Sequence, residues 1–252
     1  MSKVSFSSSA RALSSFASRV TAWQKKHGRH DLPWQNTRDP YRIWLSEIML
    51  QQTQVDTVMN YYARFLEAFP DVTALARAPI AQVLALWSGL GYYRRAHHLH
   101  EAAKIIAQMG AFPDTQETLM DLPGVGRSTA AAIAVFAFNR RAAIMDGNVR
   151  RVLTRHQNIV DHRGKDTDPA LWAKAESLLP RTHLVAYTQG MMDLGATVCK
   201  RTSPKCSVCP VAQDCGALAE NRAEVLPPSR APKVEERAFW LWVIRHKEHL
   251  LF

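Results

Sequence analysis

Acidic residues are scarce in this chain of 252 residues, and none precedes Asp31. Lys and Arg total 32 against 22 Asp and Glu, and the resulting net charge of +10 disfavours a cationic partner and favours a polyanion such as nucleic acid. No run reaches the roughly 18 apolar residues that a membrane span requires, so we expect no membrane contact. Cysteine is confined to four residues between 199 and 215, which leaves none for a disulfide framework elsewhere and favours a reduced compartment with a metal site.

Nearly every segment has the apolar periodicity and the end signals of a helix, which predicts an all-α fold. Near the N-terminus, apolar residues recur at helical spacing from Leu13 to Trp23 and Gly28 ends the run, which favours a folded helix over a transit peptide. A helix over 94–109 is expected to bury Leu99 and to expose Arg95. Further helices are predicted over 41–52, 55–69, 79–87, 117–122, 128–138 and 184–194, and after Asp146 and Asp168.

The last part of the chain has a different pattern. Residues 226–237 are predicted to be a linker, because prolines and mixed charges replace the apolar periodicity. Residues 238–244 are apolar and aromatic, which predicts a strand, and a polar turn and a second apolar segment at 250–252 follow. Since a lone hairpin is not independently stable, we expect 238–252 to be the start of a truncated second domain.

The four cysteines follow the pattern Cys199-x6-Cys206-x2-Cys209-x5-Cys215. Four thiolates in a short loop need a cation to compensate their charge, and iron or zinc would supply it. Structural zinc more often uses two tight Cys-x2-Cys pairs, whereas the uneven spacing here suits an iron–sulfur cubane; zinc and four free cysteines are the alternatives. The basic residues Lys200, Arg201 and Lys205 lie in the same loop, either facing phosphates or simply solvated.

The segment Leu122-Pro-Gly-Val-Gly-Arg-Ser-Thr-Ala130 has two glycines two residues apart between helices. Such a turn exposes backbone N–H groups at a helix N-terminus, and these groups bind phosphate without reading sequence. This is the helix-hairpin-helix pattern, although most short Gly-x-Gly pairs are simple turns. The candidate DNA-binding positions in it are Leu122, Gly124, Val125, Gly126 and Ser128.

Glu47 and Asp146 are candidate catalytic acids with opposite expected environments. Glu47 is three and four residues from Trp44 and Ile43, so it projects from an apolar helix face where burial would raise its pKa. Asp146 comes where a helix starts, so that backbone N–H groups should hold it ionised. One site can thus keep an acid and an anion at neutral pH, but a satisfied core Glu and an ordinary N-cap Asp fit the spacing as well.

Taken together, these segments resemble the helix-hairpin-helix superfamily of DNA glycosylases with an iron–sulfur cluster, which has the endonuclease III-like fold, and within it the adenine-specific glycosylases. The resemblance covers residues 14–252. It rests on LPW (32–34), SEIMLQQTQV (46–55), LWSGLGYYRRA (86–96), LPGVGRSTA (122–130), DGNVRRVL (146–153), QGMMDLGATVC (189–199) and the cysteine array.

The resemblance implies two helical lobes with DNA bound between them. A six-helix barrel lobe at 33–142 carries the hairpin, and residues 1–32 and 143–225 form the cluster lobe. Full-length relatives continue into a Nudix-like domain that recognises 8-oxoguanine opposite the adenine. Residues 238–252 match only the start of that domain, so lesion recognition should be impaired.

The resemblance also assigns roles to individual residues. It implies that Glu47 protonates the excised adenine and that Asp146, supported by Asn148, stabilises the cationic sugar. One [4Fe–4S] cluster is expected on Cys199, Cys206, Cys209 and Cys215. Further matches are base-stack residues at Gln51, Gln52 and Tyr92, and adenine-pocket residues at Arg29, Leu50 and Gln189.

Ser128 departs from the bifunctional relatives, which have a catalytic Lys at this position. A Lys amine can form a Schiff base and cut the strand, whereas a Ser hydroxyl cannot, so a monofunctional glycosylase that leaves an abasic site is expected. The expected partner is double-stranded DNA with an A:8-oxoguanine or A:G mispair. We expect a monomer in the bacterial cytoplasm, at the nucleoid, with organelles and the nucleus left open. The alternatives are a bifunctional glycosylase/lyase on oxidised pyrimidines and a non-catalytic, zinc-bearing DNA-binding module.

Overall fold

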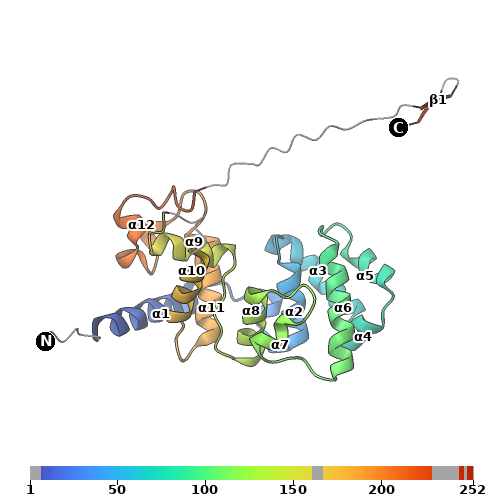
Figure 1. Cartoon of the computed structure of the whole chain (residues 1–252), viewed down its shortest axis with the longest axis horizontal. Helices are drawn as coiled ribbons and strands as arrows, with labels where there is room; N and C mark the ends of the chain where they lie inside the picture. Colours follow the sequence, from blue (N-terminus) through green and yellow to red (C-terminus); the bar gives the residue numbers. More distant parts are fainter. Residues whose placement is uncertain (1–6, 161–166, 229–243, 247–248, 252) are drawn as a thin grey trace.

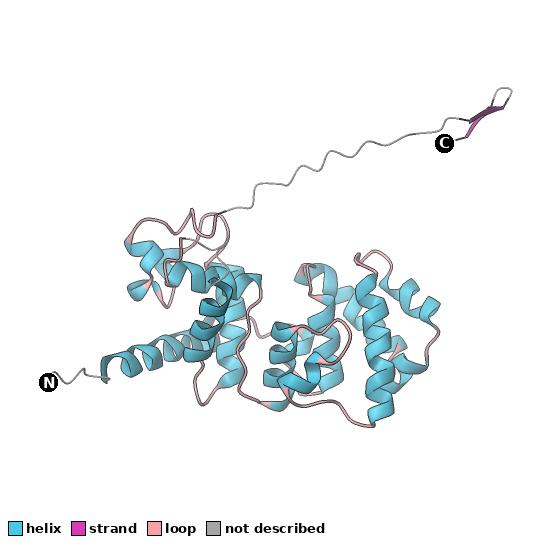
Figure 2. Cartoon of the chain, viewed as in Figure 1, coloured by secondary structure: helices cyan, strands magenta, loops and turns pink. Residues whose placement is uncertain are grey.

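A computed structural model describes residues 7–160, 167–228, 244–246 and 249–251 (Figure 1). Within these residues the helices are joined by loops, and the described strands form one hairpin in which β1 (Ile244–His246) pairs antiparallel with β2 (His249–Leu251) (Figure 2). No described helix is both long enough and apolar enough to cross a bilayer. The α-helices are α1 (Ser7–His27), α2 (Pro40–Met49), α3 (Val55–Ala68), α4 (Val72–Arg77), α5 (Ile80–Trp87), α6 (Arg94–Met109), α7 (Gln116–Met120), α8 (Arg127–Phe138), α9 (Gly147–His156), α10 (Thr167–Ser177), α11 (Leu184–Asp193) and α12 (Gly216–Ala219).

The predicted all-α class is confirmed, and each predicted helix is present with its ends shifted by a few residues. The sequence prediction missed two short helices. One is α12, and the other is α4, a six-residue helix capped by Asp71, whose carboxylate accepts a hydrogen bond from the N–H of Ala74 at 2.8 Å. Both helices are too short to show a periodic pattern. Of the strand predicted over 238–244, only Ile244 is in β1, because residues 238–243 lie outside the described part of the chain.

The buried side chains form two clusters, and α8 contributes to both. Its small alanine side chains let helices approach from two sides: Ala130, Ile133 and Ala134 face the first cluster, and Ala131, Ala132 and Val135 face the second. In Figure 1, α8 accordingly lies between the two groups of helices. The large, fully buried side chains of the first cluster include Trp44, Phe65 and Trp87, and those of the second include Phe16 and Leu153.

The prediction that Arg95 faces outward is wrong, since only 9% of this residue is exposed. Leu99, on the same helix, is buried as expected. The turn after α5 folds back over the first turn of α6, so the Arg95 guanidinium lies beneath backbone carbonyls of that turn and of the end of α2.

Candidate active site

A cavity of about 540 Å³ brings together residues that are far apart in the sequence. Its walls come from the segment after α1, from α2, from the end of α8 and from the start of α11. Four predicted site residues line it: Arg29, Glu47, Leu50 and Gln189. A cavity of this size is in the usual range for small-molecule ligands and has room for a purine base.

Glu47 is positioned by α2, which begins at Pro40 and is capped by the Asp39 side chain, an acceptor for the N–H groups of Tyr41 and Arg42. Helical spacing places Glu47 beside the fully buried Ile43 and Trp44, as predicted, while its own side chain reaches the cavity. Burial raises the pKa of Glu47 to about 8, and the carboxylate of Asp146 adds to the rise. Glu47 is therefore protonated at neutral pH.

Asp146 is the N-cap of α9. Its carboxylate accepts hydrogen bonds from the N–H of Val149 at 2.7 Å and from the side-chain amide of Asn148 at 3.3 Å. The first turn of α9 packs closely on residue 195, where a Cβ would lie 2.5 Å from the Cβ of Asn148, so only glycine fits there. Asp146 does not line the cavity itself but lies near enough to Glu47 to influence its pKa.

Asp193 is a fully buried carboxylate that holds two of the cavity residues. It accepts from the Arg29 guanidinium at 2.7 Å, from the Arg29 backbone N–H at 3.0 Å and from Nε2 of Gln189 at 2.9 Å. A carboxylate only accepts hydrogen bonds, so the Gln189 amide must turn its nitrogen toward Asp193, which leaves its oxygen for the cavity. Sequence analysis missed Asp193, although a charge in the apolar run 190–198, four residues after Gln189, is a usable signal.

Arg151 connects the Asp146 region to the cysteine loop. Its guanidinium donates to the side-chain oxygen of Asn148 at 2.9 Å, to the carbonyl of Gly195 at 2.7 Å and to the carbonyl of Cys199 at 2.8 Å. The sequence offers no signal for this role, since the segment 150–155 contains three arginines with no feature that separates them.

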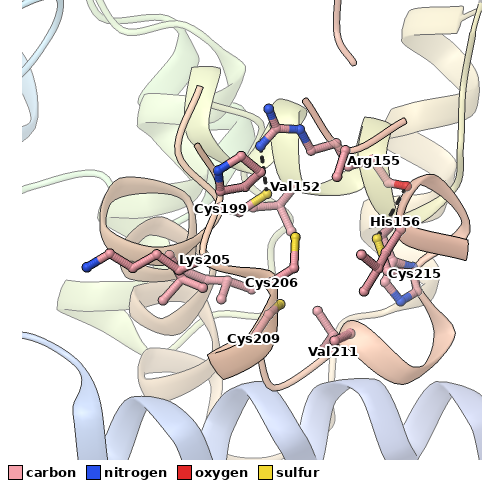
Figure 3. Close-up of a pocket in the computed structure, with 15 residues that line it drawn as sticks. Val152, Arg155, His156, Cys199, Lys205, Cys206, Cys209, Val211 and Cys215 are labelled. Carbon is pink, nitrogen blue, oxygen red and sulfur yellow. Dashed lines mark hydrogen bonds between the residues drawn. The ribbon is translucent and has the colours of Figure 1, made fainter. Parts of the chain in front are cut away.

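The four cysteines line a single pocket (Figure 3). The buried Arg155 closes one side of it: Nη1 lies 3.3 Å from the sulfur of Cys199 and 2.5 Å from the carbonyl oxygen of Lys200, and the Cys215 thiol donates to the carbonyl of Arg155. In the part of the chain that the structure describes, no three His, Cys, Asp or Glu side chains converge closely enough to hold a single metal ion. The side chains of Lys200, Arg201 and Lys205 are exposed on the same loop.

The predicted hairpin lies between α7 and α8. Gly124 has a φ of +78° and packs so closely on α6 that a Cβ would lie 2.9 Å from the Cβ of His98, so glycine is required here. Leu122 and Val125 are buried, whereas Gly124 and Gly126 are exposed. The Ser128 hydroxyl accepts a hydrogen bond from the N–H of Met145, the residue before Asp146.

The predicted base-stack residues lie on two turns. Gln51 donates to the carbonyl of Gly124 and to the hydroxyl of Thr129, both at 3.4 Å, so it contacts the hairpin. Gln52 is exposed, with a φ of +57°. Tyr92 is 61% exposed, with a φ of +50°. The aromatic ring is thus on the surface and not in the core.

These features are those of a helix-hairpin-helix DNA repair protein. Residues 45–177 match the HhH-GPD superfamily of base excision DNA repair proteins, and the chain belongs to this superfamily.

Individual relatives narrow the assignment. The chain is 38% identical over 239 residues to the adenine DNA glycosylase of Buchnera aphidicola subsp. Baizongia pistaciae, covering 93% of this chain and 68% of the relative. At this similarity the chain falls within the adenine DNA glycosylase branch. The structure of a thermostable thymine-DNA glycosylase aligns with a TM-score of 0.76 and 29% identity, over 84% of this chain and 99% of that one. Endonuclease III in a non-covalent DNA complex aligns with a TM-score of 0.70 and 20% identity, over 84% and 97%, and shares the fold.

Proposed function

We propose that this chain is a monofunctional DNA glycosylase that hydrolyses the N-glycosidic bond of adenine mispaired with 8-oxoguanine or guanine. The observation that carries the proposal is the cavity beside Glu47, a carboxyl group that is protonated at neutral pH. The carboxylate of Asp146, which caps α9, is nearby. The adenine DNA glycosylase relative supports the choice of base. A base stacked in a duplex is inaccessible, so the adenine must first be flipped out into the cavity.

In this mechanism the Glu47 carboxyl donates its proton to the departing adenine. The bond between the base and the sugar carbon breaks, its electron pair leaves with the base, and positive charge develops on the sugar. The Asp146 carboxylate, oriented by Val149 and Asn148, stabilises that charge. Water adds to the sugar carbon and gives its proton to Glu47, which regenerates the acid and leaves an abasic site.

The base pocket is expected to recognise an amino group. The Gln189 oxygen, left free by the bond from its nitrogen to Asp193, can accept from the exocyclic amine of adenine, and Arg29 supplies donors for ring nitrogens. Leu50 provides apolar contact in the same cavity.

We infer that Cys199, Cys206, Cys209 and Cys215 hold one [4Fe–4S] cluster. The four cysteines line one pocket. Their spacing, with one tight Cys-x2-Cys pair and two longer intervals, suits the separate corners of a cubane better than a structural zinc site, which more often uses two tight pairs. Such a cluster would hold the loop in place, and no chemical step of the excision involves it.

The DNA-binding surface is expected to combine three elements. The exposed backbone of Gly124 and Gly126 would bind phosphate, the turns with Gln51, Gln52 and Tyr92 would enter the base stack, and the basic cysteine loop would add charge. The two clusters of buried side chains support a division into lobes at 33–142 and at 1–32 with 143–225, with α8 shared. We propose that the protein acts as a monomer.

Single-turnover excision tests the proposal, using duplexes with A opposite 8-oxoguanine, G or C, and strand breaks scored before and after alkali. We expect adenine loss from the first two duplexes and breaks only after alkali, because Ser128 has no amine. Excision of oxidised pyrimidines with breaks before alkali would favour a bifunctional enzyme instead. A protein with stoichiometric zinc and no excision would be a DNA-binding module.

A further inference from the structure

Arg95 makes more hydrogen bonds between distant segments than a helix-surface arginine can, because its guanidinium lies between two turns of the backbone. Nη1 donates to three carbonyls of one turn, and Nη2 to one hydroxyl of the same turn and two carbonyls of the other. The acceptors are Ile48 O (3.0 Å), Met49 O (2.9 Å), Gln51 O (2.6 Å), Thr53 Oγ1 (3.0 Å), Leu90 O (3.3 Å) and Gly91 O (3.3 Å).

The two turns are the ones that carry the proposed base-stack residues. The first, 48–53, comprises the end of α2 and the turn that leads to α3, and it holds Gln52. The second, 90–92, lies between α5 and α6 and holds Tyr92. Both residues are exposed and have positive φ values, +57° and +50°, which residues other than glycine rarely adopt. The Arg95 guanidinium also lies 5.5 Å from the centre of the Tyr92 ring.

Several carbonyl oxygens pointing into one small space repel one another, and each loses water when it is buried. A guanidinium satisfies them because its donors spread in a plane and reach acceptors on opposite sides. A lysine ammonium has its donors on one atom and cannot bond to both turns at these positions. Left-handed backbone persists at such residues only where the surroundings hold it, and the Arg95 side chain hydrogen-bonds to both turns.

We propose that Arg95 is a positioning residue that fixes the two inserting turns in one relative arrangement before DNA binds. The proposal rests on the proposed function, in which these turns enter the base stack. The consequence is pre-organisation: the turns need not be ordered during binding, so more of the interaction energy is available for unstacking the adenine.

Hydrogen exchange of the free protein tests the structural part without using DNA. In Arg95→Lys, amides of 50–53 and 90–92 should exchange about tenfold faster, the equivalent of losing about one charge-assisted hydrogen bond, while α11 is unchanged. Thr53→Val removes one acceptor and should affect 50–53 alone, which keeps the test valid if Arg95→Lys folds poorly. Arg94→Lys, at the exposed neighbouring position, is the matched control. Unchanged exchange in either turn of Arg95→Lys, or an increase spread over the whole chain, would overturn the proposal.

The functional part uses duplexes with the fluorescent analogue 2-aminopurine in place of the mispaired adenine. We expect Arg95→Lys to reduce the unstacking signal and the single-turnover excision of adenine together, by about tenfold, without changing the salt dependence of binding. Faster exchange with unchanged unstacking and excision would contradict the role in DNA. If the wild-type protein excises no adenine, the proposed function fails, and the exchange data still decide whether Arg95 holds the turns.

Discussion

Glu47→Gln tests the proposed acid most directly. The amide has the size of the acid but no proton to give, and loss of a general acid typically costs 10²–10⁴-fold, so we expect single-turnover excision to slow by at least about 10²-fold. Mismatch binding and iron content should be unchanged, since Glu47 contacts neither the hairpin nor the cysteine pocket. Excision by Glu47→Gln at a rate close to wild type would show that Glu47 is a structural core residue.

The pH dependence of the same reaction follows from the raised pKa. The acid is active when protonated, so the rate should be constant through neutral pH and fall above pH 8, where the Glu47 pKa of about 8 is passed. At pH 9 only about one tenth of the carboxyl remains protonated, and the rate should fall by about tenfold from its plateau. A rate that still rises between pH 8 and 9 would contradict the assignment.

In Glu47→Gln, stability at high pH should change in the opposite direction to activity. The folded-state pKa of Glu47 is raised from 4.5 to about 8, so its contribution to folding is full below pH 4.5 and is lost as the pH rises through 8. The full shift corresponds to at most about 5 kcal/mol, and water in the cavity reduces it. Glu47→Gln stays neutral, so its melting temperature at pH 9 should be equal to or higher than that of wild type. A lower value would mean that the carboxylate stabilises the fold.

Three further outcomes are expected. Asp193→Asn should reduce excision by about tenfold and weaken the preference for adenine over a purine without the amino group, because the pocket side chains lose their shared acceptor; an unchanged preference would contradict this. Arg155→Met should lower the iron content and the melting temperature, measured by metal analysis and circular dichroism, and normal values of both would exclude its role at the cysteine pocket. Replacing Lys200, Arg201 and Lys205 with Gln should reduce the slope of log affinity against log salt by up to about 2.7 for undamaged duplex, and an unchanged slope would remove the loop from the interface.

The sequence was sufficient for the longer helices, because their signals are local. Asp39 before Pro40 and Asp146 before Gly147 are N-caps, and the apolar spacing within each helix sets its buried face. The same local reasoning placed Glu47 on an apolar face, and the structure agrees. The environment of a side chain could be predicted where it depends on neighbours one helical turn away.

The positioning residues could not be predicted in this way, because their contacts are long-range. Arg95 bonds to carbonyls more than 40 residues earlier, and Asp193 bonds to Arg29, which is 164 residues away. A periodic pattern treats a long cationic side chain near the start of a helix as solvated. It cannot anticipate that another turn of the chain will cover that side chain with acceptors.

The two acids illustrate how the fold keeps different chemistry on different elements. Glu47 is in the last turn of α2, where the backbone N–H groups are bonded within the helix and its environment is set by packing, so it keeps its proton. Asp146 is at a helix start, where the free N–H of Val149 donates to one of its oxygens. Arg151 donates hydrogen bonds both to the side chain of Asn148, which contacts Asp146, and to the carbonyl of Cys199. The position of the Asp146 carboxylate therefore depends on the cysteine loop. Loss of the loop should therefore affect the sugar side of the reaction, through Asp146, while the protonated state of Glu47, which packing maintains, is retained.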